Sequence, residues 1–115
     1  MIKLTYRHSE SPNAPALFLI PGGPGLSSAT LRSLDRLSRS FHLYYVDLPG
    51  TNGVPYERDR SFAEIAAEIA AEVSKVGGRS FLFGHSFGGF WAADVALKVP
   101  MVAGVICAAD RKSVV

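Results

Sequence analysis

Short apolar runs alternate along the chain with stretches whose apolar residues recur at helical spacing. This alternation predicts a three-layer α/β/α domain built on a mostly parallel sheet. We expect five strands, at residues 2–7, 16–20, 41–48, 79–83 and 102–109. The runs at 16–20 and 102–109 are continuously apolar, which is typical of strands buried on both faces.

Three helices are expected between these strands. Leucines recur at helical spacing between residues 31 and 37. The strongest helix signal begins at Ser61, because Ser-Phe-Ala-Glu has the form of a capping box, in which Ser61 accepts from the Glu64 N–H and Glu64 reaches back. A third helix is expected over residues 87–99, ended by Pro100.

The composition is that of one globular domain spanning residues 1–115. The chain is 48% hydrophobic and 19% charged, with a net charge of +2. That charge is too small to indicate a nucleic acid or a membrane surface as partner. No segment has the apolar length of a signal peptide or a membrane span, so we expect a cytoplasmic protein. The oligomeric state stays open.

Cysteine and histidine usage argues against metal and disulfide chemistry. The single cysteine, Cys107, excludes an internal disulfide and fits a reducing compartment. It lies in the apolar run 102–109, which predicts a buried, unreactive thiol. One cysteine and three histidines do not make a structural zinc site, so no metal is expected. The glycine fingerprint of a dinucleotide site is missing as well, and we expect no cofactor.

The stretch Gly84-His85-Ser86-Phe87-Gly88 matches G-x-S-x-G, in which a serine lies on a sharp turn from a strand into a helix. In such a turn the serine adopts strained backbone angles, and the residues two positions to either side press against each other, so glycine fits best. The strain lifts the hydroxyl above the edge of the sheet. An apolar run precedes the motif and a helical pattern follows it. We therefore interpret Ser86 as a nucleophile and not as a polar residue of a glycine-rich loop.

Attack by a serine on an acyl group builds negative charge on the carbonyl oxygen, and two backbone N–H groups must stabilise it. Phe87, at the start of the following helix, is expected to supply one. The segment Pro-Gly-Gly-Pro-Gly, residues 21–25, should supply the other. Gly23 is the first choice and Gly22 the second, because Pro24 has no N–H. The alternative interpretation of this segment is a plain Pro-Gly turn.

The order strand, Pro-Gly-Gly-Pro-Gly, helix, Val-Asp-Leu-Pro-Gly, helix, Gly-His-Ser-Phe-Gly-Gly, helix, strand resembles the first half of an α/β-hydrolase domain, up to about residue 109. Residues 21–25 are similar to the His-Gly-Gly-Pro-Gly loop of the proline iminopeptidase branch, with Pro21 in place of the histidine. The serine motif departs from that branch and suits many esterase-like members. The resemblance implies that the first strand is antiparallel to the others, and it leaves the substrate open.

A serine hydrolase needs a histidine as general base and a carboxylate to orient it. Reacting groups gather at the carboxyl ends of parallel strands. His42 begins its strand and His8 follows the strand expected to be antiparallel, so both should lie at the opposite edge. His85 adjoins the serine in sequence but should point away from it on a sharp turn. None of the three is expected to be the base.

In this fold the catalytic residues follow the chain order serine, acid, histidine, and no histidine follows Ser86. Asp110, directly after the last strand, is the candidate for the acid. Asp47 is expected to brace the loop that follows its own strand. We therefore expect a partial α/β-hydrolase chain that lacks the triad histidine, with the strand at 102–109 left as an unpaired edge.

The leading hypothesis is a serine hydrolase that acts on an ester, amide or other small acyl substrate through an acyl-enzyme at Ser86, with weak or absent turnover by this chain alone. The alternative is a catalytically silent fragment or a small-molecule-binding module with the same fold. Dinucleotide-dependent redox chemistry is a third idea, weakened by the missing glycine fingerprint.

Overall fold

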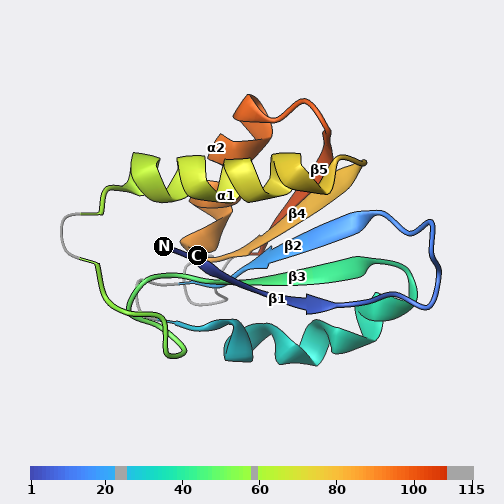
Figure 1. The fold of residues 1–115 in the computed structure, drawn as a ribbon, viewed down its shortest axis with the longest axis horizontal. Helices are drawn as coiled ribbons and strands as arrows, with labels where there is room; N and C mark the ends of the chain where they lie inside the picture. Colours follow the sequence, from blue (N-terminus) through green and yellow to red (C-terminus); the bar gives the residue numbers. More distant parts are fainter. Residues whose placement is uncertain (23–25, 58–59, 109–115) are drawn as a thin grey trace, which may run out of the picture.

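The computed structural model describes residues 1–22, 26–57 and 60–108, which form a five-stranded sheet with helices on both faces (Figure 1). The strands are β1 (Lys3–Arg7), β2 (Ala16–Ile20), β3 (His42–Asp47), β4 (Ser80–His85) and β5 (Val102–Ala108). Their order across the sheet is β1-β3-β2-β4-β5. Strand β1 is antiparallel to β3, and the other neighbours are parallel. The three-layer architecture and the antiparallel first strand are confirmed.

The helices follow the sequence signals. A 3₁₀ helix, η1 (Ser28–Arg39), covers one face of the sheet, and α1 (Phe62–Val76) and α2 (Gly88–Lys98) cover the other (Figure 1). Both hydrogen bonds of the predicted capping box are present at the start of α1. The helix ends at Val76 and is capped by Gly77, whose φ of 74° is left-handed. No helix among the described residues has the length and apolar character needed to cross a membrane.

Two hydrophobic layers hold the sheet between the helices. All five residues of β2 are buried, as a central parallel strand requires. Phe18 and Ile20 join the layer under α1 and α2, which includes Ile69 and Val95. Leu17 and Leu19 of the same strand belong to the layer under η1. The alternation along β2 therefore fixes both faces of the sheet, and with them the position of the loop that follows the strand.

Strand β5 differs from the buried strand that its apolar sequence predicts. It pairs with β4 and forms the edge of the described sheet, where Ile106 is 57% exposed. Cys107 is exposed too, so the expectation of a buried thiol is wrong. The physical reason is the edge position, since among the described residues no strand covers the outer side of β5. The expectation of an open edge is confirmed for this part of the chain.

Candidate active site

Ser86 lies on the turn between β4 and α2 in a strained conformation. Its φ is 54°, and among the described non-glycine residues only Asn52 also has a positive φ. Two backbone hydrogen bonds between residues three apart close the turn. The Gly89 N–H donates to the Ser86 carbonyl and the Phe90 N–H donates to the Phe87 carbonyl, both at 3.0 Å. The Ser86 residue is exposed. The predicted strain at this serine is therefore confirmed.

The glycines on both sides of Ser86 are required by close backbone contacts. A β-carbon on Gly84 would lie 2.4 Å from the Gly88 carbonyl oxygen. A β-carbon on Gly88 would lie 2.5 Å from the carbonyl oxygens of Ile20 and Pro21. No residue with a side chain fits at either position without moving the backbone. The motif spacing thus reflects the packing of the turn against the end of β2.

The segment after β2 reaches the serine turn, as the oxyanion hypothesis requires. A β-carbon on Gly22 would lie 3.3 Å from the Ser86 β-carbon and 3.0 Å from the His85 Nδ1 atom. The buried backbone of Gly22 therefore lies directly beside Ser86. Gly23, the first choice for the second N–H donor, lies outside the described residues.

The backbone N–H groups of Ser86 and Phe87 differ in their hydrogen bonding. The Ser86 N–H donates to the Ala108 carbonyl at the end of β5, at 2.7 Å. The Phe87 N–H has no backbone acceptor among the residues that the structure describes. It precedes the first turn of α2, where the helix dipole is positive. This free amide can receive a developing negative charge.

Asp47, at the end of β3, joins the start of η1 to the loop that follows β3. Its fully buried carboxylate accepts from the Ser28 N–H at 2.7 Å, from the Ser28 hydroxyl at 2.8 Å and from the Asn52 side-chain amide at 2.9 Å. The bond to Asn52 confirms that Asp47 braces the loop after its strand. The two bonds to Ser28 were not predicted, because Ser28 is one of two adjacent serines and gives no sequence signal for a partner nineteen residues away.

Two of the three histidines, His8 and His42, lie far from Ser86, as the sequence predicts. The rings of His8 and His42 are 4.8 Å apart, and the Nδ1 atoms of both approach the Tyr6 hydroxyl. His42 Nδ1 also accepts from the Ser9 N–H at 3.0 Å, at the start of β3. These two rings therefore lie at the amino ends of the parallel strands, whereas Ser86 lies at the carboxyl ends.

His85 is half-buried next to Gly22, and its Nδ1 atom is buried without a hydrogen-bond partner among the described residues. No hydrogen bond joins it to the Ser86 hydroxyl in the described part of the chain. Asp110, the candidate acid, lies outside the described residues. The described site therefore contains a strained serine and a neighbouring amide without a backbone acceptor, and no histidine among the described residues is hydrogen-bonded to the serine.

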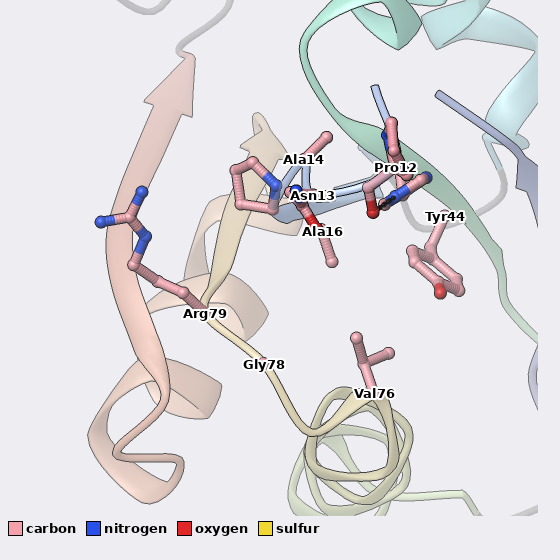
Figure 2. A pocket seen from close by; sticks show the side chains of 10 residues that line it. Pro12, Asn13, Ala14, Ala16, Tyr44, Val76, Gly78 and Arg79 are labelled. Carbon is pink, nitrogen blue, oxygen red and sulfur yellow. Dashed lines mark hydrogen bonds between the residues drawn. The ribbon is translucent and has the colours of Figure 1, made fainter. Parts of the chain in front are cut away.

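A separate cavity of about 390 Å³ lies at the opposite edge of the sheet (Figure 2). Its lining includes Ala16, His42 and Tyr44, where β2 and β3 begin, and Val76 at the end of α1. Figure 2 shows the Arg79 side chain directed away from Tyr44 and Val76. Because Ser86 follows the carboxyl end of β4, this cavity is not part of the serine site.

Within residues 1–22, 26–57 and 60–108, no three histidine, cysteine, aspartate or glutamate side chains gather into a metal-binding group. Around Ser86 the described groups are its hydroxyl, the Phe87 N–H and the backbone of Gly22, with the His85 ring beside them. Such a set suits acyl chemistry at a strained serine.

The strand–serine–helix turn, Gly22 packed against it and the order of the strands together define an α/β-hydrolase fold. The model of the alpha/beta hydrolase family matches residues 17–114, and the chain belongs to this family.

Solved structures of hydrolases share the fold. A monoacylglycerol lipase from Paleococcus ferrophilus is 25% identical, with a TM-score of 0.76 over 93% of this chain and 42% of the lipase. A probable hydrolytic enzyme from Pseudomonas aeruginosa is 25% identical, with a TM-score of 0.77 over 92% of this chain and 36% of its own. A proline iminopeptidase-related protein from Thermus thermophilus is 24% identical, with a TM-score of 0.76 over 92% of this chain and 40% of its own. The chain therefore spans about two fifths of the length of these structures.

Proposed function

We propose that Ser86 is the nucleophile of a serine hydrolase that cleaves an ester, an amide or a related small acyl substrate. One observation carries the proposal: an exposed serine with a φ of 54° adjoins both the backbone of Gly22 and the Phe87 N–H, which has no backbone acceptor among the described residues. Strain of this kind costs roughly 1–3 kcal/mol, and such strain clusters at functional sites. Membership of the alpha/beta hydrolase family supports the reaction class.

In the proposed reaction the Ser86 Oγ atom forms a bond to the carbonyl carbon of the substrate. The carbonyl oxygen becomes negatively charged and is held by the Phe87 N–H and by an N–H of the segment that begins at Gly22. The bond to the leaving group then breaks, and the proton of the serine hydroxyl passes through a general base to the leaving group. A water molecule then attacks the carbonyl carbon of the acyl-enzyme, with its proton taken by the same base. The bond to the Ser86 Oγ atom breaks, the acid product leaves, and the base returns the proton to the serine hydroxyl.

The proposal places the general base outside these 115 residues, because no hydrogen bond joins His8, His42 or His85 to the Ser86 hydroxyl in the described part of the chain. This chain alone should therefore acylate slowly. The oxyanion donors and binding alone retain a residual rate about 10³–10⁴-fold above the reaction in water. A base supplied from solution should recover part of the missing rate.

Labelling with an alkyl fluorophosphonate in the presence of added imidazole tests this proposal. We expect imidazole to raise the rate of covalent labelling on the order of tenfold, since a general base contributes 10²–10⁴-fold when positioned. Ser86→Ala should abolish the imidazole-dependent labelling, and Ser33→Ala, at an exposed position on η1, should retain it. Equal labelling of the chain and of Ser86→Ala would contradict the proposal.

The second candidate is a non-catalytic small-molecule-binding module. It is favoured because, in the described part of the chain, no histidine is hydrogen-bonded to Ser86. A folded chain that binds a small amide but whose Ser86 never reacts, with or without imidazole, would support this second candidate.

A further inference from the structure

A second hollow in the molecule lies directly beside the serine turn. It has a volume of about 330 Å³ and lies between the segment after β3, the start of α1 and the start of α2. Its lining is mostly apolar: Pro49, Tyr56, Phe62, Ile65, Phe87 and Trp91. The volume is at the lower end of the range for small-molecule sites, which are largely apolar with a few polar groups.

Three aromatic rings of this cavity hold one another in place. The Phe62 ring stacks on the Trp91 ring, with centroids 5.3 Å apart and planes at 9°. The Phe87 ring meets the Trp91 ring edge-on, at 4.9 Å and 78°. The Trp91 indole N–H donates to the Phe62 carbonyl at 3.3 Å. These contacts orient the wall before any ligand arrives, so little order is lost on binding.

The aromatic side of the cavity is held in place by these contacts but remains exposed to solvent. Phe62 is 38% exposed, Phe87 is 36% exposed and Tyr56 is 78% exposed. An apolar ligand group that covers these rings removes apolar surface from water, which favours binding. One of the exposed rings, Phe87, belongs to the residue next to Ser86.

Two polar residues, Glu57 and Arg60, complete the lining. The Arg60 guanidinium donates to Glu57 at 2.7 Å and to Glu68 at 3.2 Å. The N-terminal ammonium of Met1 pairs with the same two carboxylates, so two cations and two carboxylates balance in the described part of the chain, and no net positive charge remains there to attract an anion. This balance favours an uncharged apolar group over a carboxylate or phosphate.

Phe87 connects the cavity to the chemistry. Its N–H is the proposed oxyanion donor, and the same residue lines the cavity. We propose that the cavity binds the acyl group of the substrate of Ser86, and that this group is an uncharged, medium-length alkyl or phenylalkyl chain. With the carbonyl oxygen at the Phe87 N–H, the chain attached to the carbonyl carbon lies against Phe87, Phe62 and Trp91. The inference rests on the proposed function, because it assigns a specificity pocket to that site.

Trp91 is the single tryptophan of the chain, so its fluorescence reports on the cavity alone. Titration of the chain and of Ser86→Ala with hexanamide should give a saturable change in emission, and acetamide at the same concentrations should give none. This measurement needs no reaction at Ser86. No saturable response to hexanamide up to its solubility limit, or an equal response to acetamide, would overturn the inference.

A pair of variants tests whether hexanamide binds in this cavity. Ile65→Phe adds volume inside the cavity, and we expect at least tenfold weaker binding of hexanamide. Val105→Phe adds the same kind of ring on the exposed face of β5 and should leave binding unchanged. Circular dichroism of both variants checks that they fold. Equal loss of binding in the two variants would contradict the assigned location.

Labelling links the cavity to Ser86. Fluorophosphonates with a hexyl chain should label Ser86 at least fivefold faster than those with a methyl chain, and Ile65→Phe should remove this preference. Labelling of Ser86 without a chain preference would overturn the inference and leave the proposed function intact. Hexanamide binding without any labelling of Ser86 would contradict the proposed function and, with it, the assignment of an acyl group.

Discussion

Gly84 and Gly88 face each other so closely across the serine turn that a β-carbon on Gly84 would lie 2.4 Å from the Gly88 carbonyl oxygen. This contact closes the turn that gives Ser86 its φ of 54°. The neighbours of Gly88 on its other side are the carbonyls of Ile20 and Pro21, at the end of β2. The strained serine is therefore held between two strands, β4 and β2, and not by local sequence alone.

Gly84→Ala should destabilise the protein because the new methyl group overlaps with the Gly88 backbone, which is itself packed against the end of β2. We expect a loss of about 1–3 kcal/mol in the free energy of unfolding, measured by urea denaturation. Gly78→Ala is the matched control, since a β-carbon there has no atom within 4 Å. Its effect should stay within about 0.5 kcal/mol. Equal stability of the two variants would contradict the account of the turn.

Asp47→Ala should destabilise the protein through unsatisfied partners. The substitution leaves the buried N–H and hydroxyl of Ser28 without the acceptor that they have in the wild type. Each such group costs about 1–3 kcal/mol, so we expect a loss of about 3 kcal/mol in the free energy of unfolding. Asn52→Gly removes one bond to Asp47 and accepts the positive φ, so it should cost less than about 1 kcal/mol. A loss in Asp47→Ala no larger than that in Asn52→Gly would refute this role.

The capping box predicts an acid-dependent contribution to stability. The hydrogen bond from the Ser61 backbone N–H lowers the pKa of Glu64 below its ordinary value of 4.5. Because the pKa is lower in the folded state, the Glu64 charge stabilises the protein above the unfolded-state pKa, and this stabilisation is lost as the pH falls through the folded-state pKa. Glu64→Gln retains an oxygen acceptor but cannot ionise.

The free energies of unfolding of the wild type and Glu64→Gln should therefore differ by a constant amount near neutral pH and converge below about pH 4.5. Ser61→Ala, which removes the other half of the box, should cost about 1 kcal/mol. Urea denaturation at a series of pH values measures both effects. A difference that grows toward acid pH would show that the sign is wrong.

Cys107 should react as an exposed thiol. Because it is the single cysteine, the reaction of the native protein with Ellman's reagent reports on this residue alone. We expect a rate within about tenfold of that of the chain unfolded in guanidinium chloride. A thiol that reacts only after unfolding would contradict this exposure and would show that its contact with the Gly89 carbonyl of α2, at 3.7 Å, shields it.

The sequence predicted the parts of the fold that depend on local patterns. Apolar periodicity located the strands and helices, and the G-x-S-x-G spacing located the strained serine because only glycine fits at residues 84 and 88. The capping box at Ser61 was equally local. In each case the controlling contacts lie within a few residues or follow from the pairing of adjacent strands.

The exposure of β5 and the bonds from Asp47 to Ser28 depend on tertiary structure instead. A continuous apolar run reads the same in a central strand and in an edge strand, so the exposure of Cys107 could not be read from its neighbours. The Asp47 bonds join segments that meet when β3 enters the sheet beside β2. The aromatic cavity also arises from three separate segments, and no motif in the sequence marks it.

The central claim is that the Ser86 hydroxyl reacts with acyl-type electrophiles. Trypsin cleavage after Arg79 and Lys98 releases a peptide of residues 80–98 that contains two serines, Ser80 and Ser86. After fluorophosphonate labelling with imidazole present, tandem mass spectrometry of this peptide should place the phosphonate on Ser86. An adduct on Ser80 or on residues elsewhere in the chain, with Ser86 unmodified, would contradict the assignment of this serine as the nucleophile.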